Sequence, residues 1–211
     1  VWRATDRGAL RPIQSTAFES QQAFLKDPDG FWAALKARSI AIFHHDEVRP
    51  ITFDVGALGQ PAFAGKVCLP SLDLPISRAL IAFLIEDRGV REAERLVRRW
   101  VRNLAKPPME SEAKLLWAIG NGECEYGIAS FPNKMEGAIP FLVEPHLISI
   151  TAVGIGRHAR NPEGAQQLVD WLVSDKAAVF RSESEFMPRP THVAGYLDEE
   201  ARLLAERAGY R

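Results

Sequence analysis

The sequence lacks the features of a membrane-spanning or nucleic-acid-binding protein. Its 26 Lys and Arg against 27 Asp and Glu leave a net charge of −1, whereas a nucleic-acid-binding protein carries a clustered excess of basic residues. The longest apolar runs, such as Ala79–Ile85, are far shorter than the roughly 20 residues that cross a bilayer. Its 15 glycines and 14 prolines are spread along the chain, so long disordered segments are not expected.

Cysteine is scarce, since the chain has only Cys68 and Cys124. The two are not in CxxC spacing, so a zinc or redox site has little support. By spacing alone they can be buried free thiols, because free cysteine behaves as a small hydrophobic residue. They can equally form one disulfide that closes a loop of about 57 residues, stabilises the fold by about 2–4 kcal/mol and indicates an oxidising compartment.

The remaining composition is that of an ordinary globular protein, with 46% hydrophobic and 25% charged residues among 211. This length allows one large domain or two small lobes, and it can bury a core without metal or disulfide support. The chain opens at Val1 with neither a methionine nor a signal peptide. We interpret this start as the mark of a removed segment or of a fragment.

Helix-like and strand-like segments alternate along the chain, which predicts an α/β protein. Apolar and β-branched runs predict strands at Ala37–Phe43, Lys66–Leu69, Gly122–Ala129, Ile139–Val143 and Leu147–Ile155. Apolar residues at helical spacing predict helices at Ser77–Asp87, Val90–Arg102, Ser111–Gly120, Asn161–Val173 and Leu197–Ala208. Gly89 separates the first two helices.

No catalytic motif is found in the sequence. It contains no G-x-S-x-G, phosphate loop, His-Glu-x-x-His or dinucleotide fingerprint, and no nucleophile, base and orienting group can be assigned together. We therefore expect no enzymatic activity and no cofactor. His44 and His45 do not change this, because adjacent residues of a strand point to opposite faces and do not easily bind one metal ion.

Three segments occur in an order and spacing that resemble a known family. Gly65–Cys68 comes first, Val101–Pro108 follows with Asn-Leu-Ala-Lys-Pro-Pro, and Ala118–Ala129 contains Gly-Glu-Cys-Glu. Together they resemble the bacterial ferric-ion-binding periplasmic proteins, the substrate-binding components of iron ABC importers. Asp27–Trp32 and Asn161–Ala165 extend the similarity on either side.

The resemblance covers roughly residues 8–190 and implies the type 2 periplasmic-binding-protein fold, with two α/β lobes. Residues 1–43 and 147–211 are expected to form lobe 1 with the C-terminal helices, and residues 44–146 to form lobe 2. The family's first two βα units have no counterpart here, so one lobe is expected nearly complete and the other truncated. The family's cysteines pair, which favours a Cys68–Cys124 disulfide and a periplasmic location.

The resemblance also implies a site in the interlobe cleft. In the family, the start of the helix after the first cysteine strand binds an anion that caps the metal, and a strand arginine reaches the cleft. The candidate ligand-binding residues are Arg38, Ser71, Asp73, Ser77, Ser130 and Asn133. From the residues alone, Ser71, Asp73 or Ser77 can equally serve as the cap of the helix that follows, and Arg38 can be a structural arginine paired with a carboxylate.

The iron-binding members carry a pair of tyrosines just past the Gly-Glu-Cys strand. This chain reads Ser-Phe-Pro-Asn over residues 130–133. Ferric iron favours anionic oxygen donors such as phenolate, which Phe and Pro do not offer. We therefore expect neither a tyrosinate iron site nor any other metal site built from protein ligands alone.

The function implied is that of an extracytoplasmic solute-binding protein, which closes on a small anion or a metal–anion complex and delivers it to an ABC permease. Two alternatives stay open: a truncated relative that serves as an interaction or structural module, and a fragment of a longer binding protein. A truncated lobe would expose sheet edge and apolar surface. We expect compensation by a homodimer or by the helix Leu197–Ala208 covering the gap.

Overall fold

The computed structural model describes residues 1–49, 54–131, 133–143, 146–180, 192–194 and 197–210. The chain divides into two compact units, and each is described here by itself. Unit 1 comprises Val1–Ala37 and Ile150–Met187, and unit 2 comprises Arg38–Ser149 and Pro188–Arg211. The division falls within two strands, β2 (Ala33–His45) and β6 (Leu147–Val153), which both continue from one unit into the other.

Unit 1 is built from short elements around a small apolar core. Its helices are α1 (Trp2–Asp6), α2 (Thr16–Glu19) and α5 (Pro162–Val173), with 3-10 turns at Ala23–Leu25 and Asp175–Phe180. Two short strands, β1 (Leu10–Arg11) and β7 (Ile155–Gly156), pair antiparallel. The buried core residues are Ile13, Phe18, Ala33, Ile155, Val169 and Val173. The start of α5 is fixed by the Asn161 side chain, which accepts a hydrogen bond from the Gly164 N–H (2.9 Å).

Unit 2 holds most of the mixed sheet, whose strand order is β3-β4-β2-β6-β8, with β5 also paired to β2. The bounds are β3 Val67–Cys68, β4 Tyr126–Phe131, β5 Ala138–Leu142 and β8 His192–Ala194. β2 runs antiparallel to both β4 and β5, while β3 lies parallel to β4 and β6 lies parallel to β8. This mixed α/β architecture is the fold class that the alternating pattern predicts.

The disulfide interpretation is confirmed, because Cys68 and Cys124 are bonded with their Cα atoms 5.9 Å apart. Both cysteines are buried, Cys68 at the end of β3 and Cys124 just before β4. The bond therefore ties together the two ends of the segment that contains α3 (Pro75–Arg102) and α4 (Glu112–Gly120). None of the described helices is both long and apolar enough to span a membrane.

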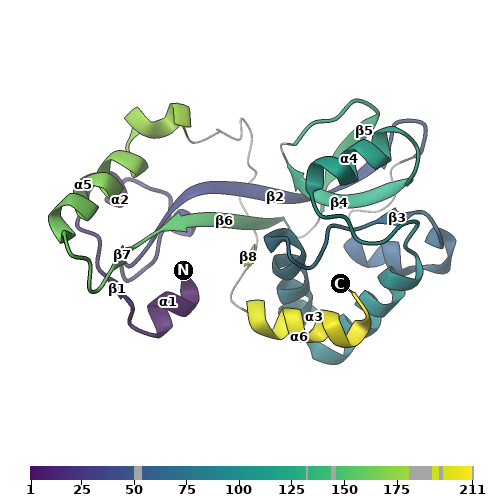
Figure 1. Ribbon diagram of the computed structural model, residues 1–211, viewed down its shortest axis with the longest axis horizontal. Coiled ribbons are helices and arrows are strands. Elements are labelled where there is room, and N and C mark those ends of the chain that lie inside the picture. The colour runs from purple at the N-terminus through teal and green to yellow at the C-terminus, as the bar shows by residue number, and fades with distance from the viewer. Residues whose placement is uncertain (50–53, 132, 144–145, 181–191, 195–196, 211) are drawn as a thin grey trace. The chain divides into compact units, whose positions relative to one another are not determined.

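The C-terminal helix lies in a different unit from the one predicted. Residues 188–211 were expected in lobe 1, but they group with unit 2. The reason is that α6 (Asp198–Ala208) packs its buried residues Ala201, Leu204 and Ala205 against α3 (Figure 1). The apolar face of this helix lies on α3 within unit 2, and the expected compensation for a truncated lobe stays a prediction.

The long helix α3 is bent at Gly89, whose φ of 74° and ψ of 158° are not helical. A positive φ strains any residue with a Cβ, so glycine suits this position. The two helices predicted on either side of Gly89 are thus the two halves of α3. Both halves contribute to the unit 2 core, with Ile81 and Leu84 before the bend and Trp100 after it among the fully buried side chains.

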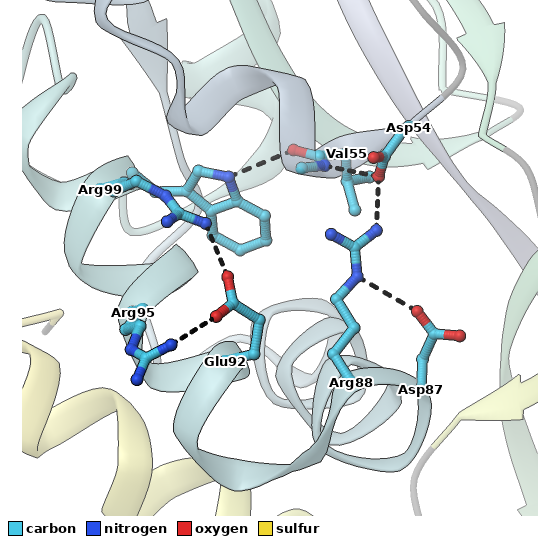
Figure 2. A network of polar contacts seen from close by, with 9 residues as sticks. Asp54, Val55, Asp87, Arg88, Glu92, Arg95 and Arg99 are labelled. Atoms are coloured by element: carbon cyan, nitrogen blue, oxygen red, sulfur yellow. Dashed lines mark hydrogen bonds and ion pairs between the residues drawn. The ribbon is translucent and has the colours of Figure 1, made fainter.

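One short segment, Asp54–Val55, holds both halves of the bent helix (Figure 2). Before the bend, Arg88 Nη2 donates to Asp54 Oδ1 (2.8 Å). After the bend, Trp100 Nε1 donates to the Val55 carbonyl oxygen (3.2 Å). Asp54 Oδ1 also accepts from the Gly56 N–H (2.8 Å), which fixes the 3-10 turn Val55–Gly59 against α3. The bend is therefore restrained from outside the helix.

We expect Trp100→Phe to lower the free energy of unfolding by about 2–4 kcal/mol, because it leaves a cavity and removes the donor to a buried carbonyl. Trp100 is 0% exposed, whereas Trp117 on α4 is 53% exposed. Trp117→Phe is the matched control and should change stability by less than about 0.5 kcal/mol. Urea denaturation followed by far-ultraviolet circular dichroism measures both, and equal losses would contradict the assigned role of Trp100.

Candidate functional site

Three of the predicted site residues converge on one carboxylate, that of Glu112. Ser130 donates to it from its backbone N–H and from its hydroxyl, the latter at 3.2 Å from Oε1. Asn133 Nδ2 donates to Oε2 (3.1 Å), and Arg38 Nη1 lies 4.0 Å from Oε1. One backbone amide, one hydroxyl, one side-chain amide and one guanidinium thus surround a single oxyanion.

The β2–β4 pairing brings these donors together. Its register places Ser39 opposite Phe131 and Ile40 opposite Ser130, so Arg38 lies at the β2 position that adjoins the end of β4. Just past that end, the Asn133 N–H donates to the Ser130 carbonyl oxygen (3.2 Å). This turn brings the Asn133 side chain back toward α4.

Glu112 is held in place by the start of its own helix. It is the first residue of α4, which begins after Ser111, whose hydroxyl accepts from the Lys114 N–H (3.2 Å). A carboxylate in the first helical turn is stabilised by the positive end of the helix dipole. The Glu112 side chain is 18% exposed and that of Arg38 is 37% exposed, so solvent reaches the group without surrounding it.

The other three predicted residues lie near the start of α3. Ser71 and Asp73 are in the turn Pro70–Leu74 that precedes the helix, and Ser77 is in the first turn of the helix itself. The Asp73 N–H donates to Ser71 Oγ (3.2 Å), and Asp73 is exposed. None of them is the N-cap of α3, which is Leu74 without a side-chain cap, so the capping interpretation is wrong. Ser77 is 1% exposed, and its hydroxyl lies 3.0 Å from the Pro70 carbonyl oxygen and 2.8 Å from that of Ser71.

Ser77 was predicted to bind the ligand, but its side chain is buried. A buried hydroxyl of α3 whose neighbours are carbonyl oxygens of the preceding turn is a structural link, whereas Ser71 is half-buried and Asp73 is exposed. The turn is joined to the Glu112 group through Met109, because the Ser71 N–H donates to the Met109 carbonyl oxygen (2.7 Å). Met109 lies three residues before Glu112, so the starts of α3 and α4 are tied to one another.

Neither of the two described tyrosines presents a phenolate. Tyr126 donates its hydroxyl to the Arg49 carbonyl oxygen (3.1 Å), and Tyr210 donates to that of Pro70. Burial raises the pKa of both phenols, which opposes the deprotonation that metal ligation needs. Tyr196 lies outside the described residues. Within the described ranges, no three His, Cys, Asp or Glu side chains are grouped as metal ligands.

Two residues of the site, Glu112 and Tyr210, were not among the ligand-binding residues predicted from the sequence. Glu112 follows the cap Ser111, a pattern that indicates only a helix start. Tyr210 lies 140 residues from its partner Pro70. No local pattern could have identified either one, because their partners are brought near only by the folded sheet and by the packing of α6.

Comparison with solved structures identifies the fold. A Trichodesmium protein (IdiA, FutA) in complex with iron and citrate superimposes with a TM-score of 0.81 and 24% identity, covering 100% of this chain and 80% of that one. The apo ferric-ion-binding protein A of Pasteurella haemolytica superimposes with a TM-score of 0.82 and 22% identity, and the match covers 98% of this chain and 78% of that one. The chain has the type 2 periplasmic-binding-protein fold of the ferric-ion-binding proteins. The predicted fold class is thereby confirmed.

Sequence comparison agrees with the predicted resemblance. Iron uptake protein A1 of Synechocystis sp. is 24% identical over 214 residues, and iron uptake protein A2 of the same organism is 23% identical over 211 residues. These alignments cover 88% and 87% of this chain but only 58% and 60% of the relatives. No family model matches the chain. The names of these relatives refer to iron uptake, not to an enzymatic activity.

Glu112→Ala should lower the free energy of unfolding by about 1–2 kcal/mol, because Ser130 and Asn133 lose the acceptor of their hydrogen bonds. Glu110→Ala is the matched control two residues away. Its side chain is 83% exposed and pairs with Lys114 within one helical turn, so its removal should leave stability unchanged within error. Thermal denaturation of the three proteins tests this, and equal midpoints for wild type and E112A would refute the assigned contacts.

Proposed function

We propose that this chain is an extracytoplasmic solute-binding protein that takes up a small oxyanion or a metal–anion complex. The observation that carries the proposal is the convergence of the Ser130, Asn133 and Arg38 donors on one carboxylate. Charge-assisted hydrogen bonds of this kind are the usual means of holding carboxylate and phosphate oxygens. The fold and the iron-related names of the relatives support the same class of function.

In this proposal the Glu112 carboxylate occupies the solute position while no solute is bound. A solute oxyanion takes over the donors from Ser130, Asn133 and Arg38, and the Glu112 carboxylate then turns away from them. A free anion leaves that carboxylate beside a like charge, which is unfavourable. A metal–anion complex instead brings a positive centre that offsets it. Iron would accordingly be carried as a complex with an anion and not by paired tyrosines.

The partner in this proposal is an ABC permease, and the location is outside the cytoplasmic membrane. The Cys68–Cys124 disulfide supports the location, because disulfides persist in oxidising compartments. The alternative function is a non-transport interaction module derived from a binding protein, or a part of a longer binding protein. A measurement of solute binding distinguishes the interaction module from the proposed solute-binding protein, since an interaction module has no reason to bind a small oxyanion.

A thermal-shift and calorimetric screen with phosphate, sulfate, citrate and ferric citrate tests solute binding. A bound solute stabilises the folded chain by about 2.7 kcal/mol at a concentration 100 times its Kd. Arg38→Ala should weaken binding about tenfold, because it removes a charged donor. Arg95→Ala on the exposed face of α3, where the side chain is 68% exposed, is the control and should bind like wild type. Lack of stabilisation by every probe would favour the interaction module.

Glu112→Gln distinguishes the two solute classes. If the solute is a free anion, removing the competing negative charge should tighten binding of phosphate, sulfate or citrate several-fold. If the solute is a metal–anion complex, the same change should weaken binding of ferric citrate relative to citrate. An unchanged affinity for all four probes would contradict the role given to Glu112.

A further inference from the structure

The turn Pro70–Leu74 is held by the C-terminal helix, which follows it in sequence by more than a hundred residues. In Figure 1, α6 (yellow) lies along α3, and their apolar faces form part of one core. We infer that Tyr210, just past the end of α6, is a positioning residue that sets the conformation of this turn for solute binding. The inference rests on the proposed function, because it assigns a role within the same site.

The end of α6 directs the Tyr210 side chain toward the turn. Gly209 has a φ of 80°, and its N–H donates to the Glu206 carbonyl oxygen (3.1 Å). The Tyr210 N–H donates to the Ala205 carbonyl oxygen (2.9 Å). This pair of bonds is the Schellman motif, which ends a helix in one defined geometry. Tyr210 is 2% exposed, and its hydroxyl donates to the Pro70 carbonyl oxygen.

The hydroxyls and carbonyls at this point match in number. Tyr210 and Ser77 each have one hydroxyl proton, and the carbonyl groups of Pro70 and Ser71 are the two acceptors. With both hydroxyls present, Tyr210 can donate to Pro70 while Ser77 donates to Ser71, and the two hydroxyl oxygens lie 3.2 Å apart. Loss of the tyrosine hydroxyl leaves Ser77, 3.0 Å from the Pro70 carbonyl oxygen, as its remaining side-chain donor, and the one Ser77 proton cannot serve the Pro70 and Ser71 carbonyls together. One buried hydrogen bond is then lost, which is costly.

The start of α6 holds the next part of the same turn. Asp198 Oδ1 accepts from Arg78 Nε (2.7 Å), and Arg78 Nη1 donates to the carbonyl oxygens of Leu72 (2.8 Å) and Asp73 (2.9 Å). Four successive carbonyl groups, those of residues 70–73, are thus bound by Ser77 and Arg78 of α3 and by Tyr210 just past α6. These contacts hold the turn in a conformation in which Asp73 is exposed and Ser71 is half-buried.

The experiment compares Tyr210→Phe with Tyr126→Phe. Each variant removes one phenol hydroxyl that donates to a backbone carbonyl of unit 2, but Tyr126 donates to Arg49 and not to the turn. Amide hydrogen exchange is measured at Ser71, Asp73 and Leu74. Affinity is measured by calorimetry with inorganic phosphate and with ferric citrate. Asp198→Asn, which weakens the contact at the other end of α6, is a second variant.

In Y210F the three turn amides should exchange about tenfold faster, and the affinity for the probe that binds wild type should fall about five- to tenfold, as expected for one lost buried hydrogen bond. D198N should act in the same direction, and Y126F should change neither quantity. Unchanged exchange in both Y210F and D198N, or equal effects in Y126F, would overturn the inference. So would faster exchange with unchanged affinity, because the turn would then have no part in binding.

Failure of the proposed function gives a different result. If wild type binds none of phosphate, sulfate, citrate and ferric citrate, the proposed function fails and Tyr210 has no solute to position. The exchange measurement still reports whether α6 holds the turn. The two failures are therefore told apart by wild-type binding, which is measured before any variant.

Discussion

The antiparallel pairing of β2 with β4 is the constraint on which the site of unit 2 depends. Its register is fixed by burial, since Ile40–Phe43 and the facing Ile128 and Ala129 have almost no exposure. A slip by one residue would turn all of these side chains to the other face of the sheet. The register in turn sets where Arg38 lies relative to the end of β4. The donor group around Glu112 is thus a consequence of core packing.

The Glu112 carboxylate keeps the donors of Ser130 and Asn133 satisfied. Buried polar groups without partners are costly, and Ser130 is 4% exposed. An internal carboxylate at the start of α4 supplies the acceptor and gains from the helix dipole as well. In the proposed function the protein therefore exchanges one oxyanion for another, which makes selectivity a matter of the charge that accompanies the solute.

The two helices α3 and α6 connect this site to the end of the chain. The Asp54–Val55 segment restrains the bend of α3 at Gly89, and α6 lies against the bent helix. The Pro70–Leu74 turn receives side-chain donors from Ser77 and Arg78 of α3 and from Tyr210, just past the end of α6. The apolar side chains of the turn, Leu72 and Leu74, pack on the unit 2 core, and the backbone carbonyls of residues 70–73 add hydrogen bonds to this packing.

The sequence by itself determined the α/β class, through the periodicity of its apolar residues. The type 2 binding-protein fold and the Cys68–Cys124 bond were implied only by the resemblance to a known family, which ordered motifs such as Gly-Glu-Cys-Glu carry. It also indicated Arg38, Ser130 and Asn133, which the structure brings to one place.

Only the tertiary structure decided what these residues contact. Glu112 had the pattern of an ordinary helix start, and its role appeared once the β2–β4 register placed three donors around it. Ser77 was indicated by its place after a cysteine strand, yet burial made it a structural link. The C-terminal helix was assigned to the wrong unit, because an amphipathic pattern shows that a helix has an apolar face but not which surface covers it.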